Sequence, residues 1–134
     1  MAYDGYLLKF GDTVLPNRFI KYNTFLSTPC QRQDLDSYED ADGYLHRTVL
    51  EHTRTKIEWN TPPMHRADKN EMMNIFQSAF ENEAERKVSV TYYDDESDSY
   101  KTGTFYMPDI QFTYYSATDS DIFYDSNRIS IIEY

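Results

Sequence analysis

The chain has 134 residues, with 13 Lys or Arg against 23 Asp or Glu, so its formal net charge at pH 7 is −10 with neutral histidines. A field of this sign repels phosphate groups, which disfavours both nucleic acid and anionic lipid as partners. The length suits one domain, and 40% hydrophobic and 16% aromatic residues are enough to build a core. We expect a single domain over residues 1–134, with no membrane partner and no sequence-specific nucleic acid.

The cysteine content and the length of the apolar runs narrow the class of protein further. Cys30 is the only cysteine, which excludes an intramolecular disulfide and a cysteine-based zinc site within one chain. No apolar run approaches the roughly 20 residues that cross a bilayer. Residues 1–10 lack the apolar core of a signal peptide. We therefore expect a soluble chain that is made and kept in a cytoplasm.

Extended segments dominate the first half of the chain. The expected strands cover residues 6–10, 13–15, 18–27 and 44–50. Gly11-Asp12 supplies a turn between the first two, and Pro29 is expected to end the third. The polar, acidic segment 31–43 predicts a mobile loop, of the kind that in oligomers often reaches onto a neighbour. Gly43 then turns the chain into the fourth strand.

Strict alternation marks the next strand. Thr53, Thr55, Ile57 and Trp59 alternate with charged or polar residues up to Asn60, which predicts a half-buried strand. Thr61-Pro62-Pro63 stops it.

One segment has the periodicity of a helix. Met72, Ile75, Phe76, Ala79 and Phe80 form one apolar stripe at helical spacing. Asp68 followed by Glu71 resembles a capping box at its start. We predict an amphipathic helix over about residues 68–82. We expect its stripe to pack across a sheet, and the alternative is a stripe that binds a partner.

The remaining residues return to strand patterns. We expect strands at residues 87–93, 101–107, 110–114 and 128–134. The first two form a hairpin around a charged turn at residues 94–99, and residues 118–126 form a polar connection. The fold class is therefore α+β and mainly β: an antiparallel β-sandwich or barrel with one flanking amphipathic α-helix.

The sequence shows no recognisable catalytic machinery. His46, His52 and His65 have no metal-ligand spacing, the four glycines form no phosphate loop, and no nucleophile elbow occurs. We expect no enzyme activity, no catalytic residue, no metal and no cofactor. An enzyme that uses its acidic residues remains an alternative, and it would need a deep cleft with convergent carboxylates.

Three acidic segments are candidates for calcium binding. With Gly43 as the turn glycine of a calcium loop, Asp40 and Asp42 fall at ligand positions, but Tyr38 and Val49 fall where oxygen ligands are obligatory. The groups 94–98 and 119–125 are also rich in oxygen atoms, and incidental calcium binding there stays open. Solvated loops are the favoured interpretation.

Six short segments carry a family resemblance through their order. They are Leu8-Lys9-Phe10-Gly11, Asp42-Gly43-Tyr44-Leu45-His46-Arg47, Thr55-Lys56-Ile57-Glu58-Trp59, Val90-Thr91-Tyr92-Tyr93-Asp94, Thr102-Gly103-Thr104-Phe105-Tyr106-Met107 and Ile131-Ile132-Glu133-Tyr134. Over nearly the full length, this series resembles a family of small structural proteins of unassigned function from tailed bacteriophages (siphophages) and prophages of low-GC Gram-positive hosts. That family is similar to the tail-tube and distal-tail proteins. This chain departs from it by a longer acidic loop and a longer segment between Asp119 and Asn127.

The resemblance implies a structural component of a long non-contractile tail, as a tube-like or distal-tail (tail-tip) subunit. It implies homo-oligomeric rings, hexamers by analogy, that contact neighbouring tail proteins and surround the passing DNA. The location implied is the virion tail, with assembly in the host cytoplasm. A head–tail connector or tail-completion protein is the first alternative. A monomeric carbohydrate-binding module with an exposed aromatic platform such as Trp59 is the second.

Overall fold

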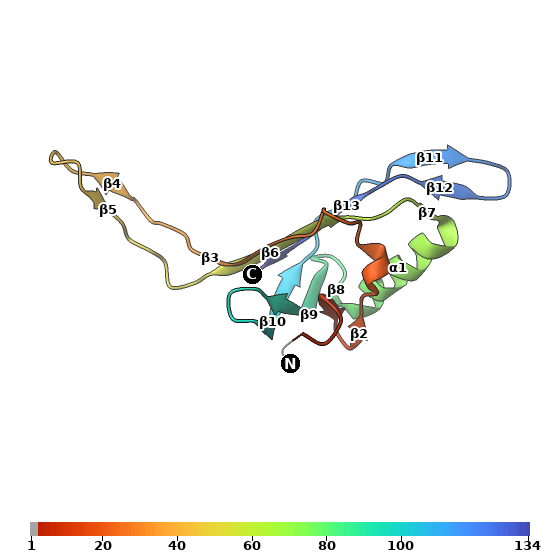
Figure 1. Cartoon of the computed structure of the whole chain (residues 1–134), viewed down its shortest axis with the longest axis horizontal. Helices are drawn as coiled ribbons and strands as arrows, with labels where there is room; N and C mark the ends of the chain where they lie inside the picture. The colour runs from red at the N-terminus through yellow and green to blue at the C-terminus, as the bar shows by residue number, and fades with distance from the viewer. Residues whose placement is uncertain (1–2) are drawn as a thin grey trace.

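An antiparallel sheet of eight strands forms the body of the molecule, shown in the computed structural model of Figure 1. The structure describes residues 3–134, so Met1 and Ala2 of the predicted domain and N-terminal segment lie outside the described residues. Seven strands follow in the order β2-β1-β9-β10-β13-β6-β3, and β8 pairs with β9. Their bounds are β1 Leu8–Phe10, β2 Thr13–Val14, β3 Leu26–Gln31, β6 Arg54–Asn60, β8 Phe80–Asn82, β9 Lys87–Asp94, β10 Ser99–Tyr106 and β13 Arg128–Glu133.

Smaller elements extend this body at both ends. One hairpin pairs β4 (Tyr38–Glu39) with β5 (Leu45–His46). A three-stranded sheet has the order β11 (Tyr114–Ala117), β12 (Ile122–Tyr124) and β7 (Met64–His65). The one α-helix among residues 3–134, α1, spans Arg66–Ala79, and a short 3-10 turn, η1, spans Asn17–Phe19. The predicted class, mainly antiparallel β with one flanking helix, is confirmed.

The predicted alternation produces the core. In β6, Thr55, Ile57 and Trp59 are buried, and in β9 every second residue from Val88 to Asp94 is buried. β10 pairs with β9 over eight residues but with β13 at only two positions, Phe105↔Glu133 and Tyr106↔Ile132. The hydroxyl oxygens of Thr55 on β6 and Tyr92 on β9 lie 3.1 Å apart, so these two strands face each other across the core.

Helix α1 covers the core through the predicted stripe. Met72 and Phe76 are fully buried, and the Phe76 ring lies 4.9 Å from that of Phe10 on β1. The helix nevertheless ends at Ala79 rather than at residue 82, because Phe80 pairs with Val88 as part of β8. Within residues 3–134, no helix is long and apolar enough to span a membrane.

The predicted capping box is wrong. The residue before the helix is His65, which makes no side-chain cap and belongs to β7, paired with Phe123 of β12. The chain therefore passes from strand to helix without an intervening loop. Asp68 and Glu71 instead accept hydrogen bonds from the guanidinium group of Arg18, at 3.3 Å for Asp68.

Several strand boundaries also differ from the prediction. The segment 18–27 begins in η1, and the strand β3 continues past Pro29 to Gln31. Pro29 is tolerated because β3 is an edge strand, and its register with β6 shifts between Thr28 and Gln31, where Cys30 has a φ of 51°. In the segment 110–114 only Tyr114 is in a strand, and the polar stretch 118–126 contains β12.

Candidate assembly interface

Two hairpins project from the body in opposite directions (Figure 1). We call residues 32–53 the first arm and residues 114–124 the second arm. The first arm includes most of the segment predicted to be a mobile loop. It forms a long paired ribbon rather than an irregular loop, because residues 31–43 fold back along residues 44–50.

Backbone hydrogen bonds join the two sides of the first arm near its root. The N–H of Leu35 donates to the carbonyl of Thr48 at 2.7 Å, and the N–H of Leu50 donates to the carbonyl of Gln33 at 2.8 Å. Between them, the Arg47 guanidinium donates to both carboxylate oxygens of Asp34, with Nη2 at 2.8 Å and Nε at 3.1 Å. Hydrogen bonds from Arg47 lower the pKa of Asp34 below its ordinary value. This two-pronged ion pair fixes the register of the ribbon.

Asp40 holds the turn at the tip of the first arm. Its carboxylate accepts hydrogen bonds from the backbone N–H groups of Asp42 and Tyr44, each at 3.0 Å, and lies 2.7 Å from Nε2 of His46. The pKa of Asp40 is lowered, first by the hydrogen bond from His46 and then by that from Tyr44. Gly43, with a φ of +84°, provides the left-handed residue that a three-residue hairpin loop requires. The structure thus uses Asp40 and Gly43 to close a turn.

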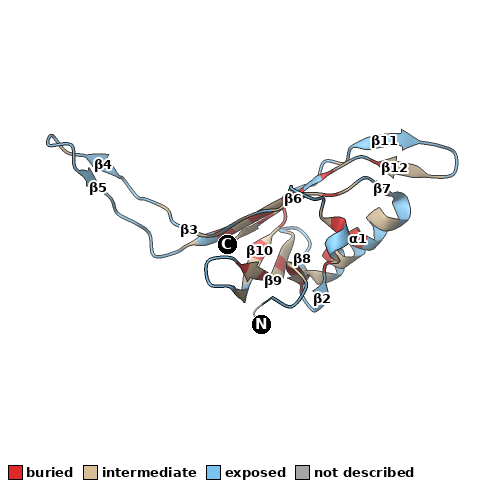
Figure 2. Ribbon diagram, in the orientation of Figure 1, coloured by how far each residue is buried: buried red, intermediate tan, exposed pale blue. Residues whose placement is uncertain are grey.

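The first arm exposes its apolar side chains. No residue from 32 to 53 is buried, and Tyr44 and Tyr38 are 71% and 60% exposed (Figure 2). The other exposed apolar residues of this arm are Leu35, Leu45, Val49 and Leu50. A two-stranded hairpin has no facing layer that could cover them. Apolar groups gathered on a projecting ribbon are typical of a contact surface.

The first arm is also acidic. Two basic and six acidic residues between 32 and 53 give it a net charge of −4 with neutral histidines. Asp34 and Asp40 are engaged in the arm itself, whereas Glu39 and Asp42 at the tip have no ion-pair partner among residues 3–134. The tip therefore presents aromatic and apolar side chains together with free carboxylates.

The second arm is shorter and is tied to the body. Tyr114 and Tyr115 are 62% and 73% exposed, and the Tyr115 ring meets Phe123 edge-on at 5.6 Å. At the turn of the arm, Nδ1 of His65 lies 3.0 Å from a carboxylate oxygen of Asp121. The pKa of Asp121 is lowered by the backbone N–H of Ile122 and, to a smaller extent, by His65. This arm thus joins the start of α1 through β7.

The remaining sequence candidates are separated in space. His46 lies in the first arm, His65 lies in β7 beside the second arm, and Nε2 of His52 lies 2.7 Å from the backbone oxygen of Tyr134. Within residues 3–134, no three His, Cys, Asp or Glu side chains come together in a way that could hold a metal ion. Cys30 is half-buried, and its backbone N–H donates to the Thr55 hydroxyl at 3.1 Å.

The acidic group 94–98 closes the β9–β10 hairpin. Burial of Asp94 acts to raise its pKa, but hydrogen bonds from Lys101, the N–H of Glu96 and the Ser97 hydroxyl outweigh this and lower it. The Asp94 side chain is 1% exposed, and Nζ of Lys101 lies 2.7 Å from it. At the same turn, the Tyr93 hydroxyl donates to Asp98, which raises the pKa of Tyr93 to about 12. These carboxylates serve the structure of the turn.

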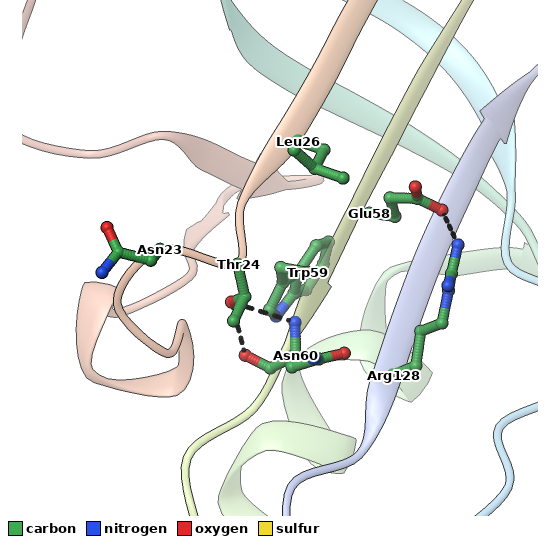
Figure 3. A pocket seen from close by; sticks show the side chains of 7 residues that line it. All are labelled: Asn23, Thr24, Leu26, Glu58, Trp59, Asn60 and Arg128. Carbon is green, nitrogen blue, oxygen red and sulfur yellow. Dashed lines mark hydrogen bonds and ion pairs between the residues drawn. The ribbon is translucent and has the colours of Figure 1, made fainter.

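Trp59 is not an exposed aromatic platform. The side chain is 1% exposed, and its ring lies 6.1 Å from that of Phe25. Figure 3 shows the indole beside Thr24 and Asn60, while Glu58 points away from it toward Arg128. The expectation of an exposed Trp59 was therefore wrong, and the carbohydrate-binding alternative loses the residue on which it depended.

The fold and its arms define a mainly β protein with two projecting hairpins. The chain belongs to a family of unknown function, DUF6711, whose model matches residues 1–134. A chain in the virion of a native gene transfer agent (GTA) particle is similar, with a TM-score of 0.49 and 13% identity over 99% of this chain and 95% of that one. A likeness of this size carries no argument about function. No curated protein matches the sequence significantly.

Proposed function

We propose that this chain is a structural subunit of a phage-like virion that assembles with copies of itself through its two arms. The observation that carries the proposal is the pair of hairpins at opposite ends, whose tyrosines are 60–73% exposed at Tyr38, Tyr44, Tyr114 and Tyr115. Apolar side chains placed this way contribute little to the core and gain burial only when another surface covers them.

The opposite placement of the arms supports head-to-tail assembly. An arm at each end lets one subunit contact a neighbour on each side through different surfaces. Such head-to-tail contacts generate a ring when the rotation closes and a filament when it does not. A ring in the long non-contractile tail, at the tube or at the distal tip, is the role we propose, and the ordered motifs that resemble tailed-phage proteins support it.

An enzyme receives less support from the surface. None of the five main depressions on residues 3–134 is lined by more than one carboxylate. A general acid and base acting as a pair need two such groups within reach of one substrate. We therefore propose a structural role without catalysis.

The test compares the full chain with a variant whose first arm is shortened by replacing residues 36–47 with Asn-Gly. Light scattering after gel filtration and negative-stain microscopy, over a range of protein concentrations, measure the assembly. We expect rings of fixed order from the full chain and monomers from the variant. The variant should keep its circular dichroism spectrum, because the removed residues contribute nothing buried.

A control variant has the same change in net charge as the variant with the shortened arm. The shortened arm lacks four acidic residues and one basic residue, a change of +3. Asp12→Asn, Glu83→Gln and Asp95→Asn produce the same change at exposed positions of the body and should leave assembly intact. A full chain that stays monomeric at every concentration would overturn the proposal, as would a shortened variant that forms the same rings.

A further inference from the structure

A shallow depression lies on the body next to the point where the chain leaves β6 for β7. It is lined by Asn17, Arg18, Ile20, Lys21, Tyr22 and Pro62. Tyr22 is 92% exposed, the highest value among the exposed large apolar and aromatic residues of the described chain. Ile20 and Pro62 form an apolar wall beside it. The depression therefore offers an aromatic ring and an apolar surface to a partner.

One positive charge in this depression is not neutralised. Arg18 is paired with Asp68 and Glu71 of α1. Lys21, in contrast, has no carboxylate within ion-pair distance among residues 3–134, and its Nζ reaches only the Ser126 hydroxyl, at 3.4 Å. A free ammonium group on a protein of net charge −10 favours an acidic partner.

The tip of the first arm has the complementary chemistry. Tyr44 and Leu45 are 71% and 59% exposed, and Glu39 and Asp42 beside them are acids without ion-pair partners among residues 3–134. The second arm does not complement the tip in this way. Its charged residues, Asp119 and Asp121, are both acidic, so contact between the two arms brings like charges together.

The tip and the depression cannot meet within one copy. The first arm extends away from the body at one end, whereas η1 and the connection from β6 to β7 lie toward the other end, near α1 and the second arm (Figure 1). A contact between them therefore joins two copies head to tail, which is the geometry that closes rings.

We propose that the tip of the first arm of one copy binds in the Tyr22 depression of the next copy. Tyr44 and Leu45 cover Tyr22 and the apolar wall, and Glu39 or Asp42 pairs with Lys21. This inference rests on the proposed function and names the partner of the first arm as a second copy of the chain.

Two single-cysteine variants test the contact directly. Both carry Cys30→Ser, which removes the only natural cysteine. One adds Tyr22→Cys and the other adds Tyr44→Cys. After mixing and mild oxidation, we expect a disulfide-linked dimer on a non-reducing gel that forms in the mixture and not from either variant alone. Tyr115→Cys in place of Tyr44→Cys places the thiol on the second arm and should give no such product.

Charge reversal tests the same contact by another route. Lys21→Glu should weaken self-association on the order of ten-fold, which corresponds to about 1.4 kcal/mol. Adding Asp42→Lys to that variant should restore most of the loss. Lys9→Glu, which makes the same charge change in β1, should have little effect. Circular dichroism confirms that each variant is folded.

The outcomes separate this inference from the function on which it rests. Linkage of Tyr22→Cys to Tyr115→Cys, or to itself, would overturn the inference. So would rings that need the first arm but ignore changes at Lys21 and Tyr22, and in that case the proposed function would stand. A full chain that never self-associates would overturn both.

Discussion

The body and the first arm are built from the same element, the antiparallel hairpin, but they use their apolar residues differently. In the β9–β10 hairpin, Val88, Val90 and Phe105 are fully buried under α1 and the other half of the sheet. In the first arm, Tyr38 and Leu45 occupy comparable strand positions and remain 60% and 59% exposed. The difference is the presence of a second layer, which the β9–β10 hairpin has and the first arm lacks.

This difference shows what a strand pattern encodes. Alternation specifies which side chains share a face, but it does not specify what covers that face. In the body, the covering layer comes from the same chain, and the result is stability. In the arm, the cover must come from elsewhere, so its apolar residues are available for assembly.

The largest expected effect comes from removing one aromatic ring from each region. Phe105→Ala in β10 should lower the free energy of unfolding by about 3–5 kcal/mol, because its ring is fully buried and packs against Tyr92 at 5.5 Å. Tyr44→Ala in the arm should change it by less than about 0.5 kcal/mol. Urea titrations at low protein concentration measure both. Equal losses would mean that the arm belongs to the cooperative core.

A smaller effect is expected from the carboxylates. Asp94→Asn should destabilise the protein by about 1–3 kcal/mol at neutral pH, because the buried group loses a charge-assisted bond from Lys101. The pKa of Asp94 is lower in the folded state than its ordinary value of 3.8. Its contribution is therefore complete above that value and is lost as the pH falls through the folded pKa, so wild type and variant should converge in acid.

Asp34→Asn in the first arm is the matched control for Asp94→Asn. The pKa of Asp34 is also lowered, but the group lies on an exposed ribbon. We expect global unfolding to be unaffected at every pH, because screening by solvent weakens the pair with Arg47. A loss equal to that of Asp94→Asn would contradict the separation of body and arm.

An effect smaller than that of Asp94→Asn is expected at the surface of the body. Arg18→Gln breaks two ion pairs with α1 whose members are about half exposed. We expect a loss of at most about 1 kcal/mol, and less in high salt, because exposed pairs are solvated and screened. Thermal unfolding at low and high salt measures it. A large loss that does not depend on salt would show that Arg18 anchors the helix through packing.

The sequence predicted elements whose burial repeats with a regular period. The strands around Ile57, Val90 and Ile131 and the stripe of α1 were found because a neighbouring layer imposes that period. Boundaries failed where a distant partner decides the structure. Phe80 lies outside the helix because it pairs with Val88. His65, directly before the helix, pairs with Phe123.

The candidate assembly interface was predicted only in part. Gly43 correctly marked a turn, and the segment after it was expected to be extended. The acidic segment before the turn was interpreted as a loop, because its composition is typical of solvated chain and its pairing depends on Asp34, Asp40 and the backbone. The local periodicity of the sequence does not indicate that the ribbon projects from the body. The depression around Tyr22 likewise has none, since Pro62 lies forty positions further along the chain.

Strand β6 has a mechanical consequence for a molecule with an arm at each end. It receives the chain directly from the first arm, and the chain then runs through Pro62 to β7, which pairs with β12 of the second arm. Tension between the two ends therefore runs along the backbone of β6. β6 is joined to its antiparallel neighbours β3 and β13 by hydrogen bonds that lie perpendicular to that direction. The pull therefore loads these hydrogen bonds in shear, so they resist it together rather than opening one by one. A pull on the arms can thus be transmitted past the core without unzipping it.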